Sequence, residues 1–215
     1  MATDRKTKSG KRAAPRRAGW DFVAGHLLIA MPNMRDPRFE HSVILMCAHD
    51  KDHAMGVIVN KPLGDVELGE LLEQLDIDPR EGVGGDPVYF GGPVQTERGV
   101  VLHTLDYRTE ATVEICPGIG VTTSREILAD IGGRGRNRPP PARFLVAIGH
   151  AGWAGGQLEA EFAVNAWVHS KADPALVFAD NPGDSWSKAL KSLGVTGAML
   201  SPEWASARHG DAPLH

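Results

Sequence analysis

The sequence predicts one α+β domain built on a mixed, largely antiparallel β-sheet. Several short apolar segments typical of strands precede the first amphipathic helix. Two of them, at 43–48 and 56–60, are separated by a short polar stretch, which predicts an antiparallel hairpin. Helical patterns are interspersed with strands only later in the chain. This order favours an α+β fold over a doubly wound parallel sheet.

Length and composition narrow the class of protein. The chain has 215 residues, which fits a single domain, with 42% hydrophobic and 23% charged residues, as is usual for globular proteins. No apolar stretch approaches the roughly 18 residues that a membrane-spanning helix needs. Cys47 and Cys116 are too few for a disulfide framework and lie in apolar surroundings. We therefore expect a cytoplasmic protein that contacts no membrane and holds no cofactor.

Charge is distributed unevenly along the chain. Residues 1–20 contain seven Lys or Arg side chains and one Asp, a net charge of +6, whereas the remainder carries −10. We expect a disordered basic leader at 1–19, the domain at 20–199 and a flexible tail at 200–215. Because an acidic body repels a phosphate backbone, nucleic acid would contact this protein only through the basic residues at 5–17.

The first strands are expected at 26–31 and 43–48. Both segments are almost wholly apolar without alternation, so both faces of each strand should be covered. The third strand, at 56–60, should end before Pro62, because proline cannot donate to a ladder. The clearest helix spans 65–75, where leucines recur at helical spacing and the first residue, an aspartate, suits the N-cap.

Strands and helices alternate in the second half of the chain. Further strands are expected at 88–90, 99–103, 112–116 and 144–148, with short extended segments at 167 and 176–178. Thr123 and Glu126 form a capping box that predicts the start of a second helix. A third helix should bury Leu158, and the last should begin near Pro182. The stretch 132–141 has no periodicity and should be a surface loop.

The most informative motif is an apolar strand that ends in a glycine-rich segment at 149–156. Glycine permits left-handed backbone and close backbone approach, so successive N–H groups can point into one concavity. The functional interpretation is a ligand-binding loop, with His150 as acid, base or ligand and Trp153 as one wall. The favoured alternative for the segment itself is a tight strand-to-helix turn that needs glycine for packing alone. The candidate residues are Gly149, His150, Gly152, Trp153, Gly155 and Gly156.

A second glycine turn follows a predicted strand at Gly91 and Gly92. Two glycine turns at the same edge of the sheet would form two sides of one pocket, although each can also be a structural turn alone. Asn60 and Lys61 follow another predicted strand and complete the candidate set. A lysine at the end of a strand is usually solvated, which is the alternative for Lys61.

Potential metal ligands cluster around the first predicted hairpin. They are His41, Cys47, His49, Asp50, Asp52 and His53. The cluster lacks the paired short spacings of a zinc site, so a solvated hairpin loop is the favoured interpretation and no metal is expected. No serine lies in a nucleophile elbow, and the sequence suggests no set of nucleophile, base and orienting residue.

Four segments give the sequence a family resemblance. They are 25–39, 56–63, 88–94 and 144–161, and they occur in the same order as in the AlgH/YqgE family of bacterial proteins. The resemblance implies a single α+β domain with a partly closed β-barrel and flanking helices. His150 departs slightly from the commonest family pattern, which has a small or polar residue after the strand glycine. The basic leader is an addition to the family core.

The resemblance implies no specific activity, because the family has no established reaction and some members carry the label of transcriptional regulators. Three hypotheses follow. The first is a non-enzymatic binding or regulatory protein whose glycine segments hold a small ligand or a protein partner, with any effect on transcription indirect. The second is a hydrolase-like enzyme with His150 as base and the amides of 149–156 as an oxyanion site. The third is direct DNA binding through the basic leader.

Overall fold

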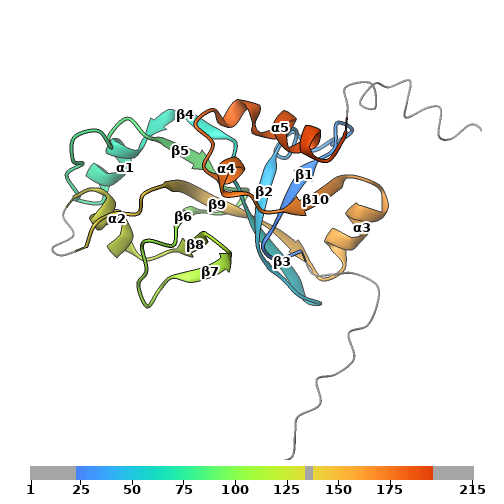
Figure 1. Ribbon diagram of the computed structural model, residues 1–215, viewed down its shortest axis with the longest axis horizontal. Coiled ribbons are helices and arrows are strands. Elements are labelled where there is room, and N and C mark those ends of the chain that lie inside the picture. Colours follow the sequence, from blue (N-terminus) through green and yellow to red (C-terminus); the bar gives the residue numbers. More distant parts are fainter. Residues whose placement is uncertain (1–22, 134–137, 196–215) are drawn as a thin grey trace, which may run out of the picture.

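The computed structural model of the protein describes residues 23–133 and 138–195. The predicted leader (1–19) and tail (200–215) lie outside these residues, as does part of the loop predicted at 132–141. The described residues form one curled sheet with helices packed on both of its faces (Figure 1).

The sheet is mixed and largely antiparallel, as the sequence predicts. Its strands are β1 (His26–Ala30), β2 (Val43–His49), β3 (His53–Ile58), β4 (Pro62–Glu67), β5 (Pro87–Phe90), β6 (Val94–Thr104), β7 (Val113–Cys116), β8 (Ile119–Thr122), β9 (Phe144–Ala154) and β10 (Trp167–Lys171). The main order is β10-β1-β2-β3-β9-β6-β8-β7, and these neighbours are all antiparallel. β5 runs parallel to β9 and carries β4 on its other side. The sheet curls into a half-barrel, which confirms the predicted fold class.

The helices lie at both ends and along one side of the sheet. They are α1 (Leu68–Gln74), α2 (Arg125–Ile131), α3 (Gln157–Ala163), α4 (Pro174–Val177) and α5 (Ser185–Ser192), with a 3-10 helix (Pro182–Asp184) before α5. Figure 1 shows α1 and α2 at the end of the molecule opposite α3. None of the helices in the described ranges is long and apolar enough to cross a membrane.

Apolar side chains fill both faces of the sheet. One core, with Leu27 and Leu45, lies on the face covered by α4 and α5. On the opposite face, α3 covers a core with Trp153 and Trp167, while α1 and α2 cover a third core. Residues 27–30 of β1 are completely buried. This two-sided burial explains why the first strands show no alternation, and it confirms that prediction.

The first helix begins later than predicted. α1 starts at Leu68 rather than at 65, because the preceding residues form β4 beside β5. Pro62 therefore opens a strand instead of only ending the previous one. At the first position of an edge strand, the missing N–H of proline costs no ladder hydrogen bond.

Other boundaries differ for local reasons. β6 begins at Val94 rather than at 99, and β8 is a short strand that the sequence pattern did not predict. The segment 176–178 is not extended, because α4 starts at Pro174 and the Asp173 carboxylate accepts a hydrogen bond from the Ala175 N–H. The second helix has Ser124 at its N-cap and lacks the side-chain bond of a capping box.

Candidate functional site

Most of the segment 149–156 is a strand, and not the loop that the sequence predicts. β9 continues through it to Ala154, and β3 pairs with 151–154. The partner strand is supplied by the β2–β3 hairpin, which sequence periodicity does not place beside β9. Only Gly155 and Gly156 form the turn into α3, where Gly156 adopts a left-handed φ of 78°.

This strand geometry removes the proposed cradle of amides. Successive residues of a strand direct their N–H groups to opposite edges, so they do not converge on one point. An oxyanion site built from the amides of 149–156 is therefore inconsistent with the paired part of β9. The hydrolase-like hypothesis therefore has no set of converging amides within 151–154.

The two glycine-rich segments lie side by side, but they do not form two sides of a pocket. Phe90 pairs with Ile148, and the Gly91 N–H donates to the Ile148 carbonyl over 2.8 Å. A Cβ added to Gly91 would lie 2.2 Å from the Gly149 oxygen, and one added to Gly92 would lie 2.2 Å from the His150 carbonyl carbon. The backbones are in direct contact, so these glycines are required for packing and leave no space between the two segments.

His150 lies half-buried on β9 next to this crossing. Burial and, to a smaller extent, the charge of Arg98 lower the pKa of its imidazole below the usual value. His150 does not belong to the residues that line the groove described below. Its assignment as a ligand or base stays a prediction.

Asn60 and Lys61 make structural contacts. The buried Asn60 side chain accepts a hydrogen bond from the Val43 N–H over 2.7 Å and donates to the His41 carbonyl over 2.9 Å. The Lys61 ammonium donates to the Arg38 carbonyl over 2.9 Å. Partial burial lowers the pKa of Lys61. Both side chains therefore fix the segment between β1 and β2.

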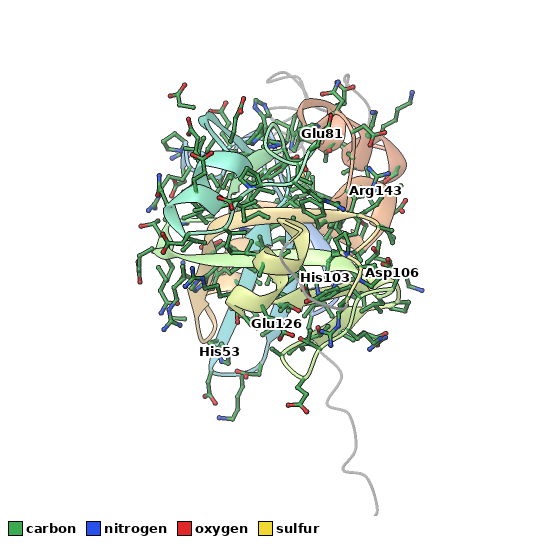
Figure 2. The ribbon with its side chains drawn as sticks, turned by 90° about the vertical axis from the view of Figure 1, so that its left-hand side faces the viewer. His53, Glu81, His103, Asp106, Glu126 and Arg143 are labelled. Carbon is green, nitrogen blue, oxygen red and sulfur yellow. The ribbon has the colours of Figure 1, made fainter. Side chains whose placement is uncertain are left out.

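The potential metal ligands do not converge. His41 packs against Trp186 at 4.2 Å between ring centroids, and the Cys47 thiol donates to the Leu45 carbonyl. His53 is exposed at the tip of the β2–β3 hairpin (Figure 2). Within the described ranges, no three His, Cys, Asp or Glu side chains are arranged to hold a metal ion.

His49 has a different role from the one its position in the cluster suggests. Its Nδ1 accepts a hydrogen bond from the Val23 N–H over 3.2 Å, and its Nε2 lies 3.0 Å from Oε1 of Glu159. Because Nδ1 is an acceptor, Nε2 carries the proton and donates to the carboxylate. His49 thus joins the end of β2 to α3.

Beside Trp153 the structure does contain a hollow, of about 630 Å³. One wall is the loop between β1 and β2, another is α3 with the turn after it, and the third is the start of β6. The lining residues are Asn33, Met34, Arg35, Asp36, Arg38, Phe39, Pro93, Val94, Gly152, Trp153, Gln157, Glu161, Val164, Ala166 and Trp167. We call this hollow the Trp153 groove.

Glu161 organises the base of the Trp153 groove. Its Oε2 accepts hydrogen bonds from Nε1 of Trp153 over 2.9 Å and Nε1 of Trp167 over 2.7 Å. Its Oε1 accepts one from Nε2 of Gln157 over 3.0 Å. Phe39 contacts both indoles, with ring centroids 6.3 and 5.8 Å away. The aromatic base is therefore fixed by both packing and hydrogen bonds.

The rim of the groove is apolar on two sides and charged on the third. Val94 is 38% exposed and Val164 is 68% exposed. On the loop wall, Arg38 forms an ion pair with Asp36 at 2.6 Å. Arg35 is exposed and makes no ion pair with any residue in the described ranges.

Several groove residues have no distinctive pattern in the sequence. The sequence gives no reason to single out Glu161, because no spacing connects it with two indoles on different strands. Phe39 and Arg35 lie in a loop whose position depends on the β1–β10 and β1–β2 pairings. Trp167 had a weak signal as a large aromatic residue in an isolated extended segment.

Comparisons with known proteins agree with this fold. The AlgH-like family profile matches residues 27–198. A UPF0301 protein of Jannaschia sp. is 47% identical over 184 residues, which are 84% of this chain and 93% of that protein. A UPF0301 protein of Shewanella oneidensis is 45% identical over 188 residues, covering 85% of this chain and 97% of that protein.

Solved structures show the same architecture. The solution structure of the AlgH protein from Pseudomonas aeruginosa has a TM-score of 0.69 at 36% identity, covering 96% of this chain and 100% of that one. A Corynebacterium diphtheriae crystal structure shares the fold, with a TM-score of 0.64 at 22% identity over 85% of this chain and 90% of that one. Because the family profile and these relatives span most of its length, the chain belongs to the AlgH-like family.

Proposed function

We propose that this protein is a cytoplasmic, non-enzymatic binding protein that receives a small ligand or a partner segment in the Trp153 groove. The observation that carries the proposal is the hollow of about 630 Å³ with a fixed aromatic base. This volume lies within the usual range for ligand pockets. Two of the four large apolar side chains exposed in the described ranges, Val94 and Val164, also lie on its rim.

Pre-organisation supports binding at this place. Trp153 and Trp167 are 5% and 3% exposed and share one carboxylate oxygen of Glu161. Their rings lose little conformational entropy when a ligand arrives, because they are already held in one orientation. An apolar group placed between Val94 and Val164 would also remove their exposed surface from water.

The composition of the groove argues for binding rather than catalysis. Its lining contains no Ser, Thr, Cys, His or Lys, the side chains that most often act as nucleophile or base. Asp36 is engaged by Arg38, which lowers the pKa of its carboxyl, and Glu161 accepts three hydrogen bonds. Any regulatory effect would then be indirect, through the bound ligand or partner. Direct DNA contact through 5–17 stays a prediction.

A fragment screen by NMR tests the proposal. Small aromatic and aliphatic fragments are added to ¹⁵N-labelled protein, and the indole N–H signals of Trp153 and Trp167 report binding. We expect the fragments that bind to perturb these signals and to raise the melting temperature through mass action. Val164→Lys should abolish the perturbation, because it places a charge on the apolar rim. Val113→Lys on β7 is the matched control, since Val113 is 58% exposed and lies outside the groove.

Two results would contradict the proposal. One is a screen in which no fragment perturbs either indole. The other is a set of fragments whose binding is the same in wild type, Val164→Lys and Val113→Lys, because these fragments would bind elsewhere.

A further inference from the structure

The Trp153 groove borders an open stretch of strand β9. β6 pairs with one edge of β9 as far as His150, which lies opposite Val94, the first residue of β6. β3 pairs with the other edge over 151–154. In the described ranges, no strand pairs with this edge of β9 after His150. The edge at 151–154 therefore lies beside the groove without a partner strand.

The backbone of Gly152 faces this open edge. The Ala154 N–H donates to Oε1 of Gln157 over 3.1 Å, and Gln157 lines the groove. The N–H and C=O groups of residues two apart in a strand point to the same edge. Gly152 therefore directs its N–H and C=O toward the groove, and it is exposed there. These are the groups that an added strand requires.

Charge on the rim distinguishes between possible occupants. On the rim, Asp36 pairs with Arg38. Glu161 keeps its charge, but it lies at the base of the groove, where donors of the protein itself already bond to both of its oxygens. Arg35 is left as the cation on the rim without an acidic partner in the described ranges. An occupant with an acidic group fits this surface better than one with a basic group.

We propose that an extended segment of a partner protein adds to β9 at Gly152, where it takes the place that β6 leaves. It places an apolar side chain against Val94 and Val164 and an acidic side chain toward Arg35. Main-chain hydrogen bonds hold the segment and the alternate side chains select its sequence, as in other cases of strand addition. This inference rests on the proposed binding role of the groove and specifies its occupant.

Selection from a random peptide library displayed on phage, with the full chain as target, provides the probes. We expect the enriched peptides to share an acidic and an apolar residue in an extended pattern. Synthetic versions with blocked ends should shift the Gly152 amide signal in ¹⁵N spectra. N-methylation of the peptide amide that pairs with Gly152 should weaken binding about tenfold, since it removes a backbone hydrogen bond and adds a clash.

Charge reversal on the rim provides the second arm of the experiment. Arg35→Glu should weaken the selected peptides about tenfold, because attraction becomes repulsion. Lys191→Glu in α5 makes the same change of charge on an exposed residue outside the groove and should leave binding unchanged. Both variants alter exposed side chains only, so folding should be retained.

Three results would overturn the inference: no enrichment, enrichment of basic peptides, or binding that tolerates every N-methylated position. The fragment screen shows whether such a result contradicts only the extended segment as occupant or also the proposed binding function. If fragments still perturb the indole signals in a manner that depends on Val164, the groove binds ligands and only the extended-segment occupant is wrong. If the fragments also fail, both proposals fall together.

Discussion

Trp153 of β9 donates its indole N–H to Oε2 of Glu161 on α3 over 2.9 Å. Trp167 donates to the same oxygen, so Glu161→Leu leaves two buried donors without a partner. Each unsatisfied group costs about 1–3 kcal/mol. We expect Glu161→Leu to lower the free energy of unfolding by about 2–5 kcal/mol, as measured by urea denaturation followed through tryptophan fluorescence.

Two variants control this experiment. Glu161→Gln keeps one acceptor oxygen for the indoles but meets the Gln157 amide with a second donor, so an intermediate loss is expected. Glu73→Leu changes an exposed glutamate of α1 and should have little effect. Equal stability of the Glu161→Leu and Glu73→Leu proteins would show that the shared oxygen contributes nothing.

The crossing of the glycine segments predicts a second sensitive position. A methyl group on Gly91 would lie 2.2 Å from the Gly149 oxygen, which is backbone and cannot move aside. We expect Gly91→Ala to cost about 3 kcal/mol or more, at the high end for single substitutions. Gly99→Ala in β6 is the matched control, because a Cβ there meets nothing within 4 Å. Melting curves that agree for the two variants would contradict the close approach.

Local patterns predicted most of the sheet. The completely buried residues of β1 lack alternation because both faces are covered, and the β2–β3 hairpin follows from two apolar runs around a polar turn. The sequence does not predict β4. The helical spacing of Leu68 and the following leucines is so clear that it predicts a helix from 65, over the last residues of the strand. Periodicity identifies where a helix packs but locates its first turn poorly.

The candidate site was only partly predictable, because long-range pairing decides it. The sequence predicts Trp153 as one wall of a pocket made by a glycine loop, whereas the structure has Trp153 on a strand beside a groove with other walls. The pairing of 151–154 with β3 makes that segment a strand. Glu161 meets both indoles because α3 packs against β9 and β10. No spacing in the sequence encodes such a meeting of one carboxylate with two strands.

Buried His103 predicts a pH dependence of stability. Its Nδ1 donates to the Thr104 carbonyl and its Nε2 accepts from the Thr122 hydroxyl, both over 2.9 Å. Burial lowers its pKa below the ordinary value of 6.5. The unfolded chain therefore takes up a proton first, and stability should fall as pH drops below about 6.5 and level off under the folded-state pKa.

His103→Gln tests the contribution of His103 to this pH dependence. The quantity to compare is the slope of the unfolding free energy against pH, which does not depend on how the substitution changes stability at neutral pH. His150, whose pKa is also lowered by burial, adds to the slope in wild type. We therefore expect His103→Gln to reduce the slope between pH 5 and 6.5, and His103→Gln with His150→Gln to reduce it further. A slope that survives in the double variant would assign the pH dependence to other groups.

The thiols predict a difference between folded and unfolded reactivity. Burial, with a smaller contribution from the nearby Cys116, raises the pKa of Cys47 to about 12. Burial also raises the pKa of Cys116, and the charge of Glu114 makes a smaller contribution in the same direction. Since the thiolate is the nucleophile, Cys47 in the Cys116→Ser protein should react with a disulfide reagent at pH 8 roughly 10³-fold more slowly when folded than in urea. Equal rates in the two states would mean that the surroundings of the partly buried Cys47 do not protect its thiol.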